Sequence, residues 1–129
     1  MSVRPVSSNP LAGCHVLVVE DEYFLADDIV RALQALGAGV LGPCGELEDA
    51  TRMLDDHLTI DAAVIDINLR SEMAFPLARL LRARSIPFVF ATGFDRAAVD
   101  AEFQDIHLWE KPLDLTAMAR DLTELIRSR

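Results

Sequence analysis

The chain has 129 residues, 51% of them hydrophobic and 26% charged, a balance typical of one soluble globular domain and not of a disordered segment. Its 12 basic and 21 acidic side chains give a formal charge of -9, which repels nucleic-acid phosphates, so we expect no nucleic-acid binding. No stretch reaches the roughly 18 consecutive apolar residues of a membrane span, and the N-terminal segment lacks the apolar region of a signal peptide. We therefore expect a cytoplasmic protein without membrane contact, with a leader over residues 1–13 and one domain over residues 14–129.

The cysteines and histidines suggest packing roles. Cys14 and Cys44 are thirty positions apart, with neither the close spacing of a metal site nor the density of a disulfide scaffold. The three histidines are also far apart in the sequence. We expect reduced cysteines and no histidine metal ligands.

The first half of the chain alternates between short apolar runs and amphipathic runs. Residues 15–19 are β-branched and apolar, which predicts a strand buried on both faces. A helix follows and ends at Gly37, a residue common after helices. A weak strand over residues 39–43, a helix over about 46–57 and a strand over 62–66 repeat the pattern.

A third helix is expected to begin near Ala74, because Pro76 is tolerated only in the first turn of a helix. Its apolar spacing predicts that Leu77, Leu80 and Leu81 are buried.

The last part of the chain continues the alternation. Residues 87–91 and 106–110 predict two further strands, and between them Asp95 is expected to cap a short helix that carries Val99 and Phe103. The apolar positions of the final helix are Leu115, Met118, Leu122 and Leu125. Five strands that alternate with five helices predict a doubly wound α/β domain with a five-stranded parallel sheet.

Polar residues follow four of the five predicted strands. In such a sheet, ligands bind beyond the carboxyl ends of the strands. The residues at these ends are Glu20, Asp21, Asp66, Asn68, Thr92 and Lys111. Each alone has an ordinary explanation, such as helix capping for Asp21, turn formation for Thr92 or solubility for Lys111. Their joint placement at four strand ends favours a functional site.

The chemistry of this set favours phosphoryl transfer. Three carboxylates held together repel one another, and a magnesium ion relieves that repulsion while keeping coordination positions for a phosphoryl group. Lys111 can neutralise a phosphoryl oxygen and Thr92 can donate a hydrogen bond to another, while an aspartate such as Asp66 can act as the nucleophile.

These motifs resemble the receiver domain of response regulators in two-component signalling. The resemblance covers about residues 15–127 and is carried by the runs VLVVEDE, AVIDINL, FATG and EKPLD. It implies a flavodoxin-like (βα)5 fold with strand order 2-1-3-4-5, and a receiver domain over residues 14–129.

The resemblance also implies roles for the site residues. Asp66 would be the phosphoacceptor, and the magnesium ligands would be Asp21, Asp66 and the Asn68 carbonyl, with Glu20 acting through water. Thr92 and Lys111 would hold the phosphoryl oxygens. Further implications are a cis peptide bond between Lys111 and Pro112 and oxyanion contacts from the amides of Ile67 and Gly93.

The run FVFATGF resembles the signature of a narrower group, the alphaproteobacterial single-domain receivers named for their FATGUY motif. Membership implies a sensor histidine kinase of the HWE type or a relative of that type as phosphodonor, and an unidentified downstream protein as partner. One position departs from the common receiver pattern: Leu108 stands where most receivers carry Tyr or Phe. No output domain is expected after the last helix, so signalling would use protein contacts or a phosphorelay.

Three other functions agree less well with the sequence. A small haloacid-dehalogenase-like phosphatase would carry its nucleophile on the first strand in an Asp-x-Asp arrangement, whereas that position reads Glu20-Asp21-Glu22, so a turnover enzyme is not expected. A receiver-fold binding module that does not use phosphate is disfavoured by the complete set of acids, Thr92 and Lys111. The run Gly37 to Gly42 matches a dinucleotide fingerprint but follows a helix, so no nucleotide cofactor is implied.

Overall fold

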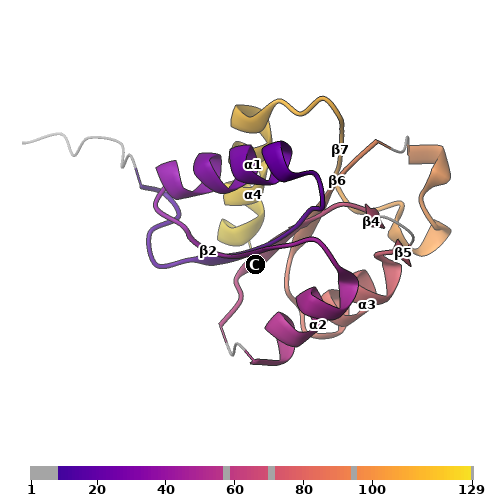
Figure 1. Cartoon of the computed structure of the whole chain (residues 1–129). Coiled ribbons are helices and arrows are strands. Elements are labelled where there is room, and N and C mark those ends of the chain that lie inside the picture. The colour runs from indigo at the N-terminus through magenta and orange to yellow at the C-terminus, as the bar shows by residue number, and fades with distance from the viewer. Residues whose placement is uncertain (1–8, 57–58, 70–71, 94–95, 129) are drawn as a thin grey trace, which may run out of the picture.

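A five-stranded parallel sheet forms the centre of the computed structural model, which describes residues 9–56, 59–69, 72–93 and 96–128 (Figure 1). The strand order is β2-β1-β3-β6-β7, which confirms the predicted order 2-1-3-4-5 and the α/β class. The strands are β1 (His15–Val19), β2 (Gly39–Cys44), β3 (Ala62–Ile65), β6 (Phe88–Thr92) and β7 (Leu108–Glu110).

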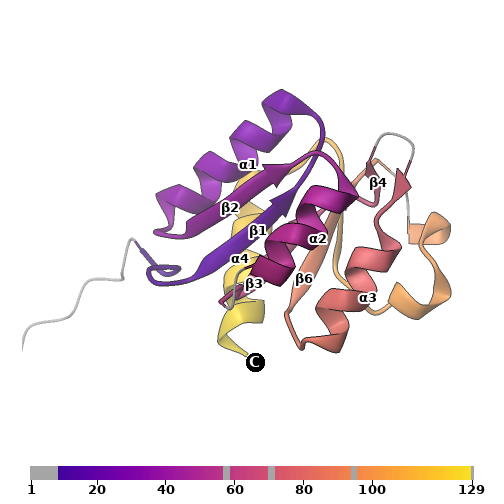
Figure 2. The same cartoon turned by 60° about the horizontal axis from the view of Figure 1, so that its bottom comes forward.

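Within the described part of the chain, four α-helices cover the two faces of this sheet (Figure 2). They are α1 (Tyr23–Ala35), α2 (Leu47–Asp56), α3 (Phe75–Ala83) and α4 (Leu115–Arg127). Helices α1 and α4 pack on one face, and α2 and α3 pack on the other. Among the described residues, no helix has the length and apolar composition of a membrane span.

Strand β1 shows why its sequence is apolar throughout. Leu17 and Val19 contribute to the hydrophobic cluster under α2 and α3, whereas Val16 and Val18 contribute to the cluster under α1 and α4. All four side chains are fully buried. Because successive side chains of a strand point to opposite faces, a strand covered on both sides must be apolar at every position.

The predicted helix around Val99 and Phe103 is wrong as an α-helix. The structure has two short 3-10 helices there, η1 (Arg96–Ala98) and η2 (Ala101–Phe103). Asp100 between them is extended, with φ -52° and ψ 144°, so the backbone cannot continue a helical hydrogen-bond ladder. Val99 and Phe103 are nevertheless buried, as predicted. The predicted cap Asp95 lies outside the described residues.

Two smaller differences concern α3 and the segment before it. Leu80, predicted to be buried, is 36% exposed, because the buried stripe of α3 runs through Leu77, Ala78 and Leu81 and position 80 lies beside that stripe. An antiparallel pair of short strands that the sequence analysis did not predict precedes the helix. These strands are β4 (Asn68–Leu69) and β5 (Glu72–Met73).

The glycine-rich run has a structural explanation. Gly37 has φ +94° directly after α1 and Gly42 has φ +97° within β2, a region that favours glycine. A Cβ atom at Gly42 would lie 2.7 Å from the Val18 carbonyl oxygen. Gly37 therefore ends a helix, as expected from the sequence, and Gly42 permits close packing of two strands.

Candidate functional site

Backbone pairing brings the polar strand ends together at one edge of the sheet. The Asp66 amide donates to the Val19 carbonyl at 2.9 Å, which places the residue after β3 beside the residue after β1. The Lys111 amide donates to the Thr92 carbonyl at 2.9 Å and fixes the end of β7 beside the end of β6. The six candidate residues therefore lie around one site because parallel strands end at the same edge.

The acidic residues form a compact group of oxygen ligands. Glu20, Asp21 and Asp66 each offer a carboxylate oxygen, and these oxygens lie within 4.8 Å of one another. Glu20 and Asp66 are 3% and 4% exposed, so little water screens their repulsion. Hard oxygen donors at this spacing fit a magnesium ion, which takes one or two carboxylates and keeps several waters.

Lys111 supplies the positive charge of the site. Its Nζ lies 2.9 Å from Asp66 Oδ2, 2.8 Å from Glu22 Oε1 and 3.0 Å from Glu20 Oε1. The contact with Glu20 is an ion pair without good hydrogen-bond alignment, whereas the other two are hydrogen bonds. The lysine side chain is 15% exposed, so it stabilises the carboxylates in a largely desolvated place.

Burial and these contacts shift the pKa values of two groups. Burial, which disfavours the charged carboxylate, raises the pKa of Glu20 from 4.5 to about 7, and the nearby charge of Asp66 adds to the increase. Burial alone would lower the pKa of Lys111, but its contacts with Glu22, Asp66 and Glu20 raise it above the ordinary value. Lys111 therefore stays charged at neutral pH, and a cation near Glu20 favours the charged form of that buried acid.

The two oxygens of Asp66 have different neighbours. Oδ1 accepts a hydrogen bond from the Asn68 amide at 3.2 Å, and Oδ2 accepts one from Lys111 at 2.9 Å. Asn68 begins β4, and the Ala74 amide donates to the Ile67 carbonyl at 2.7 Å, which closes the base of this short hairpin. The carboxylate is therefore held in a fixed orientation toward the site.

A cavity of about 400 Å³ gives access to this carboxylate. Its lining residues are Asp21, Glu22, Asp66, Asn68, Thr92, Gly93 and Lys111. A Cβ atom at Gly93 would meet nothing within 4 Å, so the backbone after Thr92 borders open space. The Lys111–Pro112 peptide bond is cis, as expected. The cavity thus combines acids, a hydroxyl and an ammonium around Asp66.

The sequence analysis assigned no role to Glu22, although the structure places it in the site. Its carboxylate accepts a hydrogen bond from Lys111 across 89 positions of sequence. The signal available in the sequence was a third consecutive acid after Glu20 and Asp21. Its reach to Lys111 depends on how the start of α1 faces β7, which spacing along the chain does not reveal.

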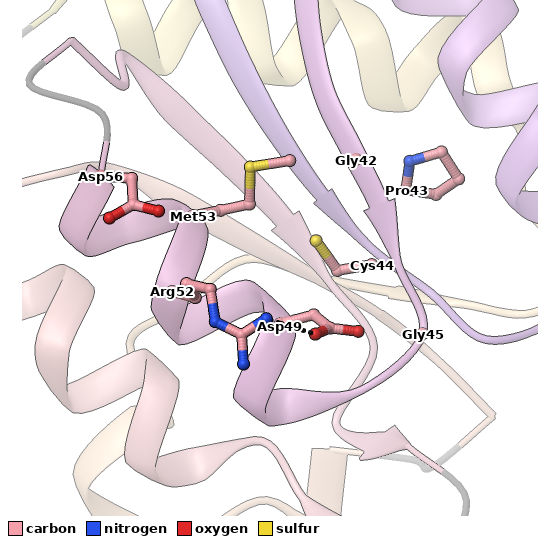
Figure 3. A pocket seen from close by; sticks show the side chains of 8 residues that line it. All are labelled: Gly42, Pro43, Cys44, Gly45, Asp49, Arg52, Met53 and Asp56. Atoms are coloured by element: carbon pink, nitrogen blue, oxygen red, sulfur yellow. Dashed lines mark hydrogen bonds and ion pairs between the residues drawn. The ribbon is translucent and has the colours of Figure 1, made fainter.

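Another cavity of similar size, about 420 Å³, lies between β2 and α2 (Figure 3). Figure 3 shows the Asp49 and Arg52 side chains of α2 paired with each other beside it, while Cys44 and Met53 contribute sulfur atoms. None of the six candidate residues lines it. The convergence of charged and polar groups therefore identifies the cavity at Asp66, and not this one, as the candidate site.

Comparisons with known proteins agree with the fold. Neither a scan against protein-family models nor a search of curated proteins gives a match. Among solved structures, SdrG from Sphingomonas melonis Fr1 is 37% identical, with a TM-score of 0.76 over 88% of this chain and 96% of that chain. A CheY-like response regulator receiver domain from Methylobacillus flagellatus is 26% identical, with a TM-score of 0.70 over 87% and 98%.

A response regulator receiver protein from Sinorhizobium medicae WSM419 has the same fold, with 23% identity and a TM-score of 0.77 over 92% of this chain and 98% of that chain. The fold and the acidic pocket define a receiver-type α/β domain. With the level of identity to SdrG, they show that the chain belongs to the response-regulator receiver family.

Proposed function

We propose that this receiver domain accepts a phosphoryl group on Asp66 in a magnesium-dependent reaction. The observation that carries the proposal is the position of the Asp66 carboxylate, which faces a 400 Å³ cavity between the acids Glu20 and Asp21 and the Lys111 ammonium. This set provides a nucleophile, oxygen ligands for a metal and a cation for developing negative charge.

The chemical step is a phosphoryl transfer. An Asp66 oxygen forms a bond to phosphorus while the bond between phosphorus and the donor's nitrogen or oxygen breaks, and the donor keeps that electron pair. Lys111 neutralises one phosphoryl oxygen and Thr92 donates a hydrogen bond to another, with the amides of Ile67 and Gly93 as further donors. When bound, magnesium would neutralise charge on the transferred group; Asp21, Asp66 and the Asn68 carbonyl would hold it directly, and Glu20 through water.

The surface beside the cavity supports a protein as the phosphodonor. Tyr23 and Phe24 directly follow the acidic run and are 78% and 81% exposed, with their rings edge to face at 5.4 Å. Exposed aromatic side chains of this size are common at protein interfaces. We propose a sensor histidine kinase as donor, of the HWE type in keeping with the FATGUY-like run FVFATGF, which contains Thr92 and Gly93.

The remaining assignments describe a cytoplasmic switch and not a turnover enzyme. Residues 14–129 would form the receiver domain, and Leu11 of the leader, which is 1% exposed, adds a contact with it. Phosphorylation would change the affinity for a downstream protein. The negative charge of -9 supports a protein and not a nucleic acid as that partner.

Intact-mass measurement tests the phosphorylation. Acetyl phosphate with magnesium should add one phosphoryl group to the native chain and to the control Asp49→Asn, an exposed aspartate of α2. Asp66→Asn should not be modified. Equal labelling of Asp66→Asn, or labelling unaffected by EDTA, would contradict the proposal. Steady turnover of 4-nitrophenyl phosphate would instead indicate a phosphatase.

A further inference from the structure

We propose that Glu22 is a positioning residue that restrains phosphorylation of Asp66 by holding the Lys111 ammonium away from the incoming phosphoryl group. The inference rests on the proposed function of the site and adds a regulatory residue to it. Its starting observation is the 2.8 Å hydrogen bond from Lys111 Nζ to Glu22 Oε1, the shortest of the three carboxylate contacts of this lysine.

The lysine has three N–H donors; in this structure Glu22 and Asp66 accept hydrogen bonds from it, and Glu20 lies in ion-pair contact with it. Two of these acids, Glu20 and Asp66, belong to the group whose oxygens lie within 4.8 Å of one another, and Glu22 does not. A divalent cation would therefore draw on Glu20 and Asp66 and compete with Lys111 for them. Glu22 would remain on the lysine and would compete with the phosphoryl group for its donors.

The position of Glu22 suits such a competitor. Its side chain is 62% exposed, whereas the Glu20 side chain is 1% exposed, so Glu22 can leave the lysine at little desolvation cost. Its backbone is fixed independently of the carboxylate, because its amide donates to Glu20 Oε2 at 3.1 Å and its carbonyl accepts from Ala26 at 2.8 Å. The Glu22 carboxylate also lines the cavity and would repel an anionic donor.

Removal of the carboxylate should make the phosphorylated state easier to reach. Beryllofluoride with magnesium serves as the probe, because it mimics a phosphoryl group on aspartate without turnover. We expect Glu22→Gln to bind it about two- to fivefold more tightly, the range expected for loss of one partly exposed ion pair. Affinity for magnesium alone should change by less than about twofold, because Glu22 lies outside the acidic trio. Labelling by acetyl phosphate should be faster to a similar degree.

Two further variants make the test specific. Glu110→Gln removes the same charge from the exposed residue next to Lys111 and should bind beryllofluoride as the native chain does. Glu22→Ser removes the carboxylate but places a favoured capping residue before α1, so it should behave like Glu22→Gln even if glutamine weakens the helix. Thermal unfolding of each variant reports any purely structural effect.

The outcomes separate this inference from the proposed function. If the native chain fails to bind beryllofluoride, or Asp66→Asn binds it equally well, the proposed function is wrong. If the native chain binds it but Glu22→Gln and Glu22→Ser match Glu110→Gln or bind more weakly, the role of Glu22 is overturned while phosphorylation of Asp66 stands. Tighter binding in both Glu22 variants at unchanged magnesium affinity would support the role.

Discussion

Replacement of Lys111 by methionine should destabilise the metal-free protein far more than the partial exposure of the lysine side chain suggests. The change keeps an apolar stem but leaves the buried carboxylates of Glu20 and Asp66 without the ammonium that now lies 3.0 and 2.9 Å away. Removal of one partner of a buried ion pair costs roughly 3–5 kcal/mol in the free energy of unfolding. Two features of this site reduce that cost.

The first feature is the cavity, which lets water approach the carboxylate of Asp66 once the lysine is gone. The second is the pKa of Glu20, raised by burial to about 7, so this acid can take up a proton near neutral pH instead of remaining charged. We therefore expect a loss of about 2–3 kcal/mol at pH 7 for Lys111→Met in EDTA. Saturating magnesium should recover most of it, because the cation replaces the missing positive charge and stabilises the folded state on binding.

Urea unfolding followed by circular dichroism measures the loss of free energy of unfolding in EDTA and its recovery in magnesium. Arg31→Met is the matched control, because Arg31 pairs with Asp27 on the exposed face of α1, and such a pair contributes about 0.5 kcal/mol or less. The electrostatic account of the site would be refuted if Lys111→Met lost no more free energy of unfolding than the control. It would also be refuted if magnesium did not reduce that loss.

Three further outcomes follow from the structure. Asp21→Ala should weaken magnesium binding by about tenfold or more, since it removes an oxygen ligand. Titration calorimetry measures this affinity, and an unchanged value would exclude Asp21 as a magnesium ligand. In EDTA, the free energy of unfolding should fall as pH rises from about 4.5 to about 7, because the raised pKa of Glu20 means that the folded state binds more protons than the unfolded state in this pH range. Glu20→Gln should flatten this pH dependence. A pH dependence unchanged in that variant would exclude Glu20 as its source. With beryllofluoride and magnesium, amide shifts should extend from Asp66 to Phe103, and Leu108→Tyr should keep phosphorylation while altering partner affinity; shifts confined to the metal pocket would contradict this relay.

The relay prediction depends on how Leu108 is packed. Leu108 packs against the cluster that contains Phe90 and Phe103, whereas its neighbour Trp109 packs on the opposite face of the sheet. The ring of Phe103 stacks on Phe75 at 5.7 Å. The aromatic rings packed near Leu108 thus belong to other elements of the fold. We therefore expect a movement of Thr92 toward a phosphoryl group to shift the segment of η1 and η2 and not a ring at position 108.

Side chains on the surface of α3 bind the segment of η1 and η2. Arg79 forms an ion pair with Glu102 at 2.6 Å, and Arg82 donates to the Glu102 carbonyl at 2.7 Å and to Asp105 at 2.9 Å. The guanidinium of Arg82 also lies 5.0 Å from the centre of the Phe103 ring. These contacts join residues 20 and 23 positions apart, so the apolar spacing that predicted a short helix here could not reveal them.

Sequence by itself determined the fold class and which polar residues stand at the strand ends. Runs such as residues 15–19 are apolar at every position because both faces of the strand are covered, and that pattern is visible without coordinates. Asp66, Thr92 and Lys111 stand at strand ends, and all parallel strands end at one edge of the sheet, so their convergence followed from topology. The predicted strand order and cis Lys111–Pro112 bond, both taken from the family resemblance, agree with the structure.

Only the tertiary structure showed that Glu22 joins these charges. Nothing in the spacing of Glu22 and Lys111 reveals their 2.8 Å contact, because it depends on the angle at which α1 leaves β1 toward the end of β7. The same holds for Leu80, whose exposure was set by how α3 lies on its neighbours. Short-range patterns record which side chains must be buried, but distances between groups from different elements arise from packing, and electrostatics at this site depends on those distances.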